Sequence, residues 1–371
     1  MHEGMIQLLF KLQEHPMAPA VRLAKEVGVS TPTAISWLDK MREDNVFRGV
    51  KANLRVHDLG LEIYDFLLEV SSFEALERIE RFCEIHPYTL YRARVYGGNH
   101  RGILIQFRQP HTTFPHLQTA LEVMKREGLV TSIRELPTLR SIYGSTHTTP
   151  LLEAWDPERM VWVFDWQSWW RTEPDLGTRE TSSVTDNRKE SHLLDLDYLD
   201  AQILQAFTSD ARRKNIDIIR SIGLDPQEGS IQQKVSKKIK RLKAAIESYR
   251  VFINWTFFDV YNTPMIIARA DSETTDRLIA KLKEGEFPFS SSIRKTTEGF
   301  VWFARLPSAH FSELVSLVWR IADSYELLIM DYRHSQTYGL WAETLDKESE
   351  GWKTGREFCL EKPLKEIGLD L

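Results

Sequence analysis

The stretch that decides the fold runs from one helix into the next at Val27-Gly28-Val29-Ser30-Thr31-Pro32. Glycine suits a tight turn because it adopts left-handed backbone angles without strain. Ser30 can cap the free N–H groups of a following helix, and Pro32 suits its first turn because no N–H is needed there. Ile35, Leu38 and Met41 then recur at helical spacing and are expected to face inward. We predict a third helix over 31–45, packed on two short helices that precede it.

The chain repeats this plan after 195 residues. Three pairs of segments share that offset: Gln7-Leu8-Leu9 with Gln202-Ile203-Leu204, Gly28 with Gly223, and Tyr143-Gly144 with Tyr338-Gly339. A common offset over so long a distance indicates an internal duplication. Residues 171–192, which lie between the copies, carry almost no aliphatic side chains and are typical of a flexible linker.

Each copy also contains a second type of unit. Residues 61–137 and 265–332 both follow the order strand, helix, strand, strand, helix, strand, which is the ferredoxin-like βαββαβ arrangement. Residues 46–52 look like the first strand and turn of a wing. The predicted fold class is therefore α+β, with two winged helix-turn-helix domains alternating with two ferredoxin-like domains. The expected division is 1–58, 59–170 with a Trp-rich extension, the linker 171–192, 193–256, and 257–371 with a C-terminal extension.

Composition restricts the class of protein. The chain has 48 Lys and Arg against 53 Asp and Glu, a net charge of −5, which excludes a uniformly basic nucleic-acid coat. Its two cysteines, Cys83 and Cys359, are far apart, so neither a disulfide framework nor a Cys-based zinc site is expected. Without long apolar runs or a signal-like N-terminus, the chain is expected to be cytoplasmic, with no membrane partner.

The third helix of a helix-turn-helix has the right width to enter a DNA major groove. We expect this helix to contact double-stranded DNA through polar side chains, with Arg48 and Lys51 of the wing beside the backbone. The predicted contacts on the helix are Ser30, Thr31, Thr33, Ser36, Trp37 and Lys40.

The corresponding helix of the second copy is much more basic. Residues 230–250 contain seven Lys and Arg against one Glu, and Ser230 with Gln233 forms an S-x-x-Q capping box. Because Val235, Ile239 and Leu242 hold the helix to its core, the cations are expected to project away from it. The predicted DNA contacts here are Gln233, Lys234, Lys237, Lys238 and Arg241.

Two stretches carry a specific resemblance. Residues 27–60, including Met41-Arg42-Glu43-Asp44-Asn45 and Asp58-Leu59-Gly60, and the segment Leu196-Asp197-Tyr198-Leu199-Asp200 resemble the Lrp/AsnC (feast/famine) family of transcription regulators. The resemblance implies a DNA-binding domain joined to a ligand-binding and dimerisation domain. It also implies a possible homo-oligomer, and a small-molecule effector held near Gly97, Asn99 and His100.

Two copies in one chain lead us to expect a single-chain pseudo-dimer, with a buried sheet face between the copies and an asymmetric DNA site. No catalytic, metal or cofactor site is expected, and the chain is predicted not to be an enzyme. Two alternatives stay open. One is a siroheme-decarboxylase-type enzyme, in which Arg92, Arg94, His100, Arg101 and Arg294 with Lys295 would face a tetrapyrrole. The other is a co-regulator that docks on the transcription machinery. The Trp-rich residues 155–170 are expected to pack as core rather than to form a pocket.

Overall fold

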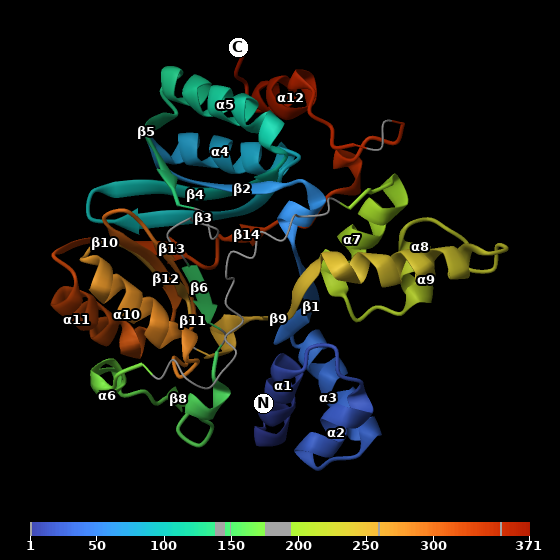
Figure 1. The fold of residues 1–371 in the computed structure, drawn as a ribbon, viewed down its shortest axis with the longest axis horizontal. Coiled ribbons are helices and arrows are strands. Elements are labelled where there is room, and N and C mark those ends of the chain that lie inside the picture. The colour runs from blue at the N-terminus through green and yellow to red at the C-terminus, as the bar shows by residue number, and fades with distance from the viewer. Residues whose placement is uncertain (1, 138–144, 149, 175–193, 259, 349–350) are drawn as a thin grey trace.

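The computed structural model describes residues 2–371 apart from 138–144, 149, 175–193 and 259 and 349–350. Most of the predicted linker 171–192 therefore lies outside the described residues. The described chain contains two helical units, two four-stranded sheets with helices on their outer faces, and extensions after each sheet (Figure 1). The mixed α and β class that we predicted is confirmed.

The first helical unit consists of α1 (Glu3–Glu14), α2 (Ala20–Val27) and α3 (Thr31–Glu43). Gly28 ends α2 with a φ of 74°, as the turn requires. Ser30 caps α3 by accepting a hydrogen bond from the backbone N–H of Thr33, as predicted. The buried residues of α3 are Ala34, Leu38 and Met41, whereas Ile35 is exposed, so the inward direction we expected for Ile35 is wrong. Ile35 follows Ala34 directly, and one helical residue turns the side chain through 100° away from the core.

The second unit repeats this arrangement with α7 (Tyr198–Asp210), α8 (Asn215–Ser221) and α9 (Ile231–Leu242). At the start of α7, Asp197 and Asp200 form a capping box in which each carboxylate accepts the other residue's backbone N–H. The capping box that we predicted at Ser230 and Gln233 is wrong, because Ser230 makes no side-chain cap to α9. The turn before α9 gives Ser230 a φ of −91° and a ψ of 13°, away from the extended geometry typical of capping serines.

Each sheet follows the predicted order of strands and helices. The first contains β2 (Glu62–Val70), α4 (Phe73–Ile85), β3 (Thr89–Gly97), β4 (His100–Gln109), α5 (Phe114–Arg126) and β5 (Val130–Leu136). The second contains β10 (Asn262–Arg269), α10 (Ser272–Lys283), β11 (Ser290–Lys295), β12 (Gly299–Arg305), α11 (Phe311–Ile321) and β13 (Ser324–Asp331). Their strand orders are β5-β2-β4-β3 and β13-β10-β12-β11, so the first strand of each unit lies between its third and fourth.

The strand after each helical unit crosses to the other copy. β1 (Phe47–Leu54) pairs antiparallel with β9 (Ile246–Ile253), so residues 46–52 do not form a hairpin of their own as the predicted wing would. We call this two-stranded ribbon the stalk. Asn53 faces Ser248 across it and donates a hydrogen bond of 2.9 Å to the Ser248 hydroxyl. These two residues are 195 positions apart in the sequence, the same offset that separates the repeated segments.

The two sheets pack on each other within the one chain. An apolar layer of side chains from both copies fills the space between them, including Leu67, Val95, Val301, Phe303 and Leu328. At one edge, β3 and β13 pair directly and join the sheets. Burial of this layer stabilises the pairing in proportion to the apolar area removed from water.

Each extension packs on the opposite copy. After the first sheet come β6 (Ser145–Thr148), which pairs with β11, and then β7 (Trp155–Asp156), β8 (Val161–Trp162) and α6 (Trp166–Arg171). After the second sheet, β14 (Gln336–Thr337) pairs with β3, and α12 (Lys362–Glu366) packs on α4 and α5. The remaining short helices are η1 (Val56–Leu59), η2 (His111–Thr113), η3 (Leu152–Ala154), η4 (Lys243–Ala245), η5 (Trp255–Phe258), η6 (Ser308–His310), η7 (Ala342–Thr344) and the π-helix η8 (Glu357–Glu361).

The Trp-rich extension is a buried core, as we predicted. Trp155, Trp162, Trp166 and Trp169 are all less than 8% exposed. The last three pack against Phe287 or Phe289 of the second copy, and Trp155 packs against Phe258. The Trp166 indole N–H donates to Nδ1 of His310 at 3.0 Å, and Nε2 of His310 lies 3.1 Å from the Trp162 carbonyl oxygen. Among the described helices, none is both long and apolar enough to cross a membrane.

Candidate nucleic-acid interface and inter-copy cleft

The outer face of α9 carries the cations that sequence reasoning predicted there. Lys234, Lys237 and Lys240 are exposed, and Gln233 is exposed beside them. Within the described part of the chain, none of the three lysines pairs with a carboxylate. Val235, Ile239 and Leu242 are buried and hold the opposite face of the helix to its core. This face is therefore open to an anionic partner.

Two of the predicted contacts on α9 bind within the protein instead. The Lys238 ammonium lies 2.5 Å from a carboxylate oxygen of Asp197 and 3.1 Å from one of Asp200, and Arg241 also pairs with Asp200. Burial acts to raise the pKa of Asp197, but hydrogen bonds from Lys238 and from the Asp200 backbone outweigh it and lower that pKa. The expectation that Lys238 projects away from the core is wrong, because Asp200 is fully buried and needs cationic partners.

The exposed face of α3 differs in charge from that of α9. Ser36 and Lys40 are exposed there as predicted, but Asp39, Glu43 and Asp44 share that face and line a hollow of about 700 Å³ with them. The Ser30 and Thr33 hydroxyls lie 2.7 Å apart within the cap, and Thr31 is only partly exposed beside them. Trp37 turns toward α1, where its ring meets the ring of His2 at 4.6 Å between centroids. This face of α3 thus carries three carboxylates against one lysine.

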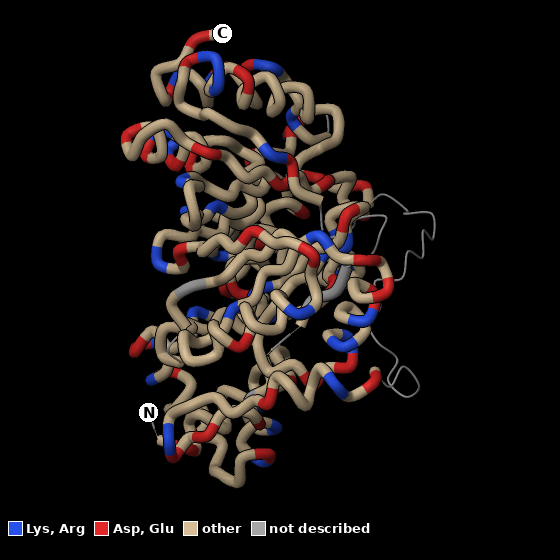
Figure 2. The backbone as a smooth tube through the Cα atoms, turned by 90° about the vertical axis from the view of Figure 1, so that its left-hand side faces the viewer, with Lys and Arg blue, Asp and Glu red and all other residues tan. Residues whose placement is uncertain are grey.

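The two predicted DNA contacts of the stalk, Arg48 and Lys51, both interact with neighbouring side chains of the protein. Arg48 donates to the side-chain oxygen of Asn45 at 3.0 Å, and the Lys51 ammonium lies 4.1 Å from the centre of the Phe252 ring. Figure 2 shows that both signs of charge are distributed along the part of the chain that it colours, so that no half of this part is uniformly basic. Any nucleic-acid contact therefore depends on local surfaces such as α9.

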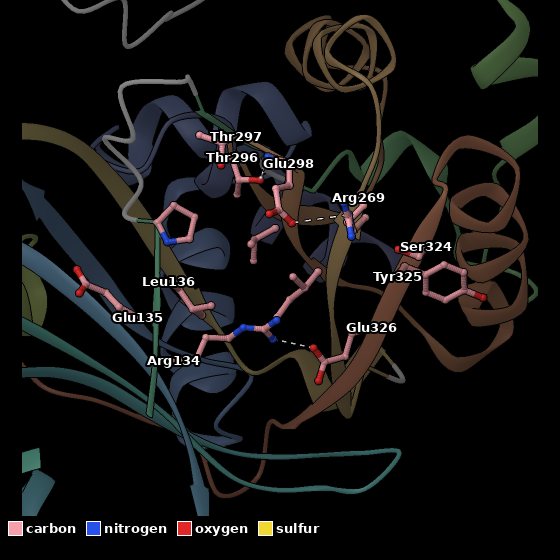
Figure 3. Close-up of a pocket in the computed structure, with 14 residues that line it drawn as sticks. Arg134, Glu135, Leu136, Arg269, Thr296, Thr297, Glu298, Ser324, Tyr325 and Glu326 are labelled. Atoms are coloured by element: carbon pink, nitrogen blue, oxygen red, sulfur yellow. Dashed lines mark hydrogen bonds and ion pairs between the residues drawn. The ribbon is translucent and has the colours of Figure 1, made fainter. Parts of the chain in front are cut away.

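A cleft lies between the copies at the end of the second sheet (Figure 3). Its volume is about 400 Å³, within the range of small-molecule sites. Arg134 of β5 reaches across it to Glu326 of β13 at 2.7 Å, and Arg269 lies 3.7 Å from Glu298. Apolar side chains such as Ile267 and Val301 also line it. Beside it, Arg294 pairs with Asp65 and donates to the Pro137 carbonyl oxygen at 2.6 Å, and both charged side chains are buried.

The predicted effector residues of the first copy are not among those that line this cleft. Gly97 approaches the other copy so closely that a Cβ atom there would lie 2.6 Å from the Leu327 carbonyl oxygen, and its φ is 155°. His100 is half-buried, and burial lowers its pKa. Asn99 lies in the turn between β3 and β4. The cleft is instead lined by Thr296, Thr297 and Glu298 of the equivalent turn in the second copy.

The arginines of the first middle strands are bound internally. Glu80 accepts from Arg92 at 2.8 Å and from Arg94 at 2.8 and 2.9 Å, and Arg92 also donates to the Tyr338 hydroxyl. In the second copy, Arg294 pairs with Asp65 and Lys295 with Asp276. Among the described residues, no group of three or more His, Cys, Asp and Glu side chains is placed to hold a metal ion.

Comparison with known proteins shows a shared fold. No protein-family model and no curated protein matches the chain. Among solved structures, the siroheme decarboxylase NirDL matches with a TM-score of 0.52 at 13% identity, over 88% of this chain and 91% of that one. The same enzyme in complex with an iron-uroporphyrin III analogue matches with a TM-score of 0.52 at 12% identity, over the same shares of both chains. An AsnC family transcriptional regulator from Agrobacterium tumefaciens matches with a TM-score of 0.33 at 23% identity, over 41% of this chain and 98% of that one.

The match to an enzyme corrects one prediction. The chain was expected not to be an enzyme, but a siroheme decarboxylase shares its fold over 88% of its length. The prediction failed because it relied on the absence of familiar catalytic motifs, whereas one architecture can serve regulation in one protein and catalysis in another.

Proposed function

We propose that this chain is a double-stranded-DNA-binding transcription regulator, a single-chain pseudo-dimer that binds the duplex chiefly through α9. In this proposal each helical unit is a helix-turn-helix head, and each sheet with its helices is a ferredoxin-like domain. The division at 1–58, 59–170, 171–192, 193–256 and 257–371 is part of the proposal. The order of strands in each sheet and the position of α9 as the third helix of its unit support it.

The single observation that carries the proposal is the open cationic face of α9. Lys234, Lys237 and Lys240 follow one another at intervals of three residues, slightly less than one helical turn, on the exposed side of α9. Lysines on such a face neutralise phosphates and release condensed counterions, which favours binding to any duplex sequence. Gln233, near the start of the helix, is the residue best suited to read a base edge, because a glutamine amide can both donate and accept.

The two heads are unequal in this proposal. On α3, Asp39, Glu43 and Asp44 oppose a phosphate backbone, whereas Ser36 and Lys40 favour it. The α9 head therefore supplies most of the affinity, and the site on DNA is asymmetric. Lys238 and Arg241 form ion pairs with Asp200 that hold α9 to α7, so in this proposal they do not contact the DNA backbone.

The salt dependence of DNA binding tests this proposal. Each phosphate contact that is lost lowers the slope of log K against log salt by about 0.9, so the triple change of Lys234, Lys237 and Lys240 to Gln is expected to lower it by about 2.7. The matched control changes three exposed lysines far from the heads, Lys125, Lys362 and Lys365, to Gln. Equal slopes for both triple variants in a fluorescence-anisotropy titration would reject α9 as the binding surface.

The inter-copy cleft favours a second candidate function, which is the binding or turnover of an anionic tetrapyrrole of the siroheme type. Its support is a cleft of about 400 Å³ with arginines at its rim, in a fold shared over 88% of the chain with siroheme decarboxylase. The internal pairing of Arg92 and Arg94 leaves Arg134 and Arg269 as the arginines that line the cleft.

Absorbance titration with iron-uroporphyrin III, followed by measurement of CO2 release from siroheme, tests this second candidate. We expect Arg134→Gln with Arg269→Gln to weaken binding at least tenfold. Arg159→Gln, at an exposed position outside the cleft, is the control and should bind normally. A wild-type spectrum that does not change at millimolar tetrapyrrole would reject this candidate and leave the DNA proposal intact.

A further inference from the structure

The stalk brings like charges together in the middle of the molecule. Lys51 of β1 and Arg250 of β9 are directly paired across the ribbon, so their side chains project from the same face. Arg305, at the end of β12, is one of the charges that lower the pKa of Arg250. Like charges placed opposite each other on neighbouring strands are destabilising unless a counter-charge lies between them.

These three cations have no acidic partner in the part of the chain that the structure describes. None of Lys51, Arg250 and Arg305 forms an ion pair with a described carboxylate, and all three are only partly exposed. The Nε atom of Arg305 is buried without a hydrogen-bond partner, while its guanidinium lies 5.1 Å from the centre of the Tyr332 ring. Burial and the nearby Arg305 lower the pKa of Arg250 to about 10. Burial, with Arg48 and Arg250, also lowers the pKa of Lys51.

We propose that Lys51, Arg250 and Arg305 form a binding site for a compact, multiply charged oxyanion between the stalk and the second sheet. Two guanidinium groups present planar forks of N–H donors that match phosphate and carboxylate oxygens, and the lysine adds a point charge. The anion replaces mutual repulsion by attraction to all three groups and provides an acceptor for the unpaired Nε of Arg305.

The position of this site links it to both heads. β1 begins four residues after the last residue of α3, and β9 begins four residues after the last residue of α9. An anion that binds Lys51 on one strand and Arg250 on the other therefore stiffens the ribbon from which both heads extend. The inference does not rest on the proposed DNA binding, because the site needs only the stalk and β12.

Thermal unfolding of the full chain at constant ionic strength tests the site, with inorganic phosphate and citrate compared against chloride. We expect phosphate or citrate to raise the unfolding midpoint by several degrees at a large excess over Kd. The two probes separate phosphate from carboxylate chemistry. Arg250→Met should abolish the rise, and its midpoint in chloride should equal or exceed that of the wild type because repulsion is removed. Lys125→Met, at an exposed position on α5, should keep the rise.

Three results would overturn the proposal. One is the absence of a rise with either anion in the wild type. Another is the same rise in Arg250→Met as in Lys125→Met, which would show a general salt effect. The third is a rise with a short DNA duplex but with neither free anion, which would assign these cations to the DNA backbone. If Arg250→Met does not fold, as judged by circular dichroism, Lys51→Met provides the same comparison from the other strand.

Discussion

The buried ion pair between Asp65 and Arg294 joins the two copies, and its removal is predicted to be severe. Asp65 lies on β2 of the first copy and Arg294 on β11 of the second, with exposures of 0% and 3%. Burial raises the pKa of Asp65, and the Arg294 guanidinium acts in the opposite direction. Asp65→Asn keeps the shape but removes the charge, so Arg294 is left as an uncompensated buried cation. We expect the free energy of unfolding to fall by about 3–5 kcal/mol.

A second, exposed ion pair between the copies provides the comparison that tests this magnitude. Arg134 and Glu326 also connect the copies, but their side chains are 49% and 41% exposed. Glu326→Gln is therefore expected to lower the stability by no more than about 1 kcal/mol, because solvent screens an exposed pair. Urea unfolding of both variants, followed by tryptophan fluorescence and circular dichroism together, measures the difference and checks that the transitions coincide.

The double variant Asp65→Leu with Arg294→Met completes the test. It removes both charges, so most of the stability lost in Asp65→Asn should return. The reasoning would be refuted if Asp65→Asn cost no more than Glu326→Gln, or if the double variant were as unstable as the single one. Either outcome would mean that the apolar layer, and not the ion pair, determines the pairing of the copies.

Three further changes probe local features. Burial lowers the pKa of His86 to about 3, so its neutral form stabilises the fold fully above pH 6.5. That contribution is lost as the pH falls from 6.5 toward 3, by about 1.4 kcal/mol per unit, and urea unfolding at pH 7, 6 and 5 should show a shallower loss in His86→Gln. Arg78→Ala removes two hydrogen bonds to the Ile367 carbonyl oxygen, so limited proteolysis should cleave the C-terminal extension faster than in the wild type. Ser30→Ala removes the cap on the Thr33 N–H and should lower stability by about 1 kcal/mol in a thermal melt, and an unchanged midpoint would contradict the capping role.

Local patterns allowed much of the fold to be predicted. The turn at Gly28, the cap at Ser30, the order of strands and helices in both sheets, and the buried Trp-rich extension all agree with the structure. The 195-residue offset also separates Asn53 from Ser248 in the sequence, and these two residues face each other across the stalk. These features follow from hydrophobic periodicity and backbone preferences, which depend on residues only a few positions apart and can therefore be recognised in the sequence.

The candidate sites were less predictable. Lys234 and Lys237 are exposed as expected, but Lys238 and Arg241 turn to Asp200, which lies 38 residues before Lys238 and 41 before Arg241. Helical periodicity tells which residues face away from the core, but it does not tell whether an acidic partner from another helix lies there.

The sequence by itself determined the elements of this protein and their duplication, because spacing and turn residues act over a few positions. Only the tertiary structure decided that β1 pairs with β9, that Asp65 meets Arg294, and that Arg134 and Arg269 border a cleft between the copies. Such contacts depend on how two units pack, and packing brings together residues more than a hundred positions apart that no local pattern connects.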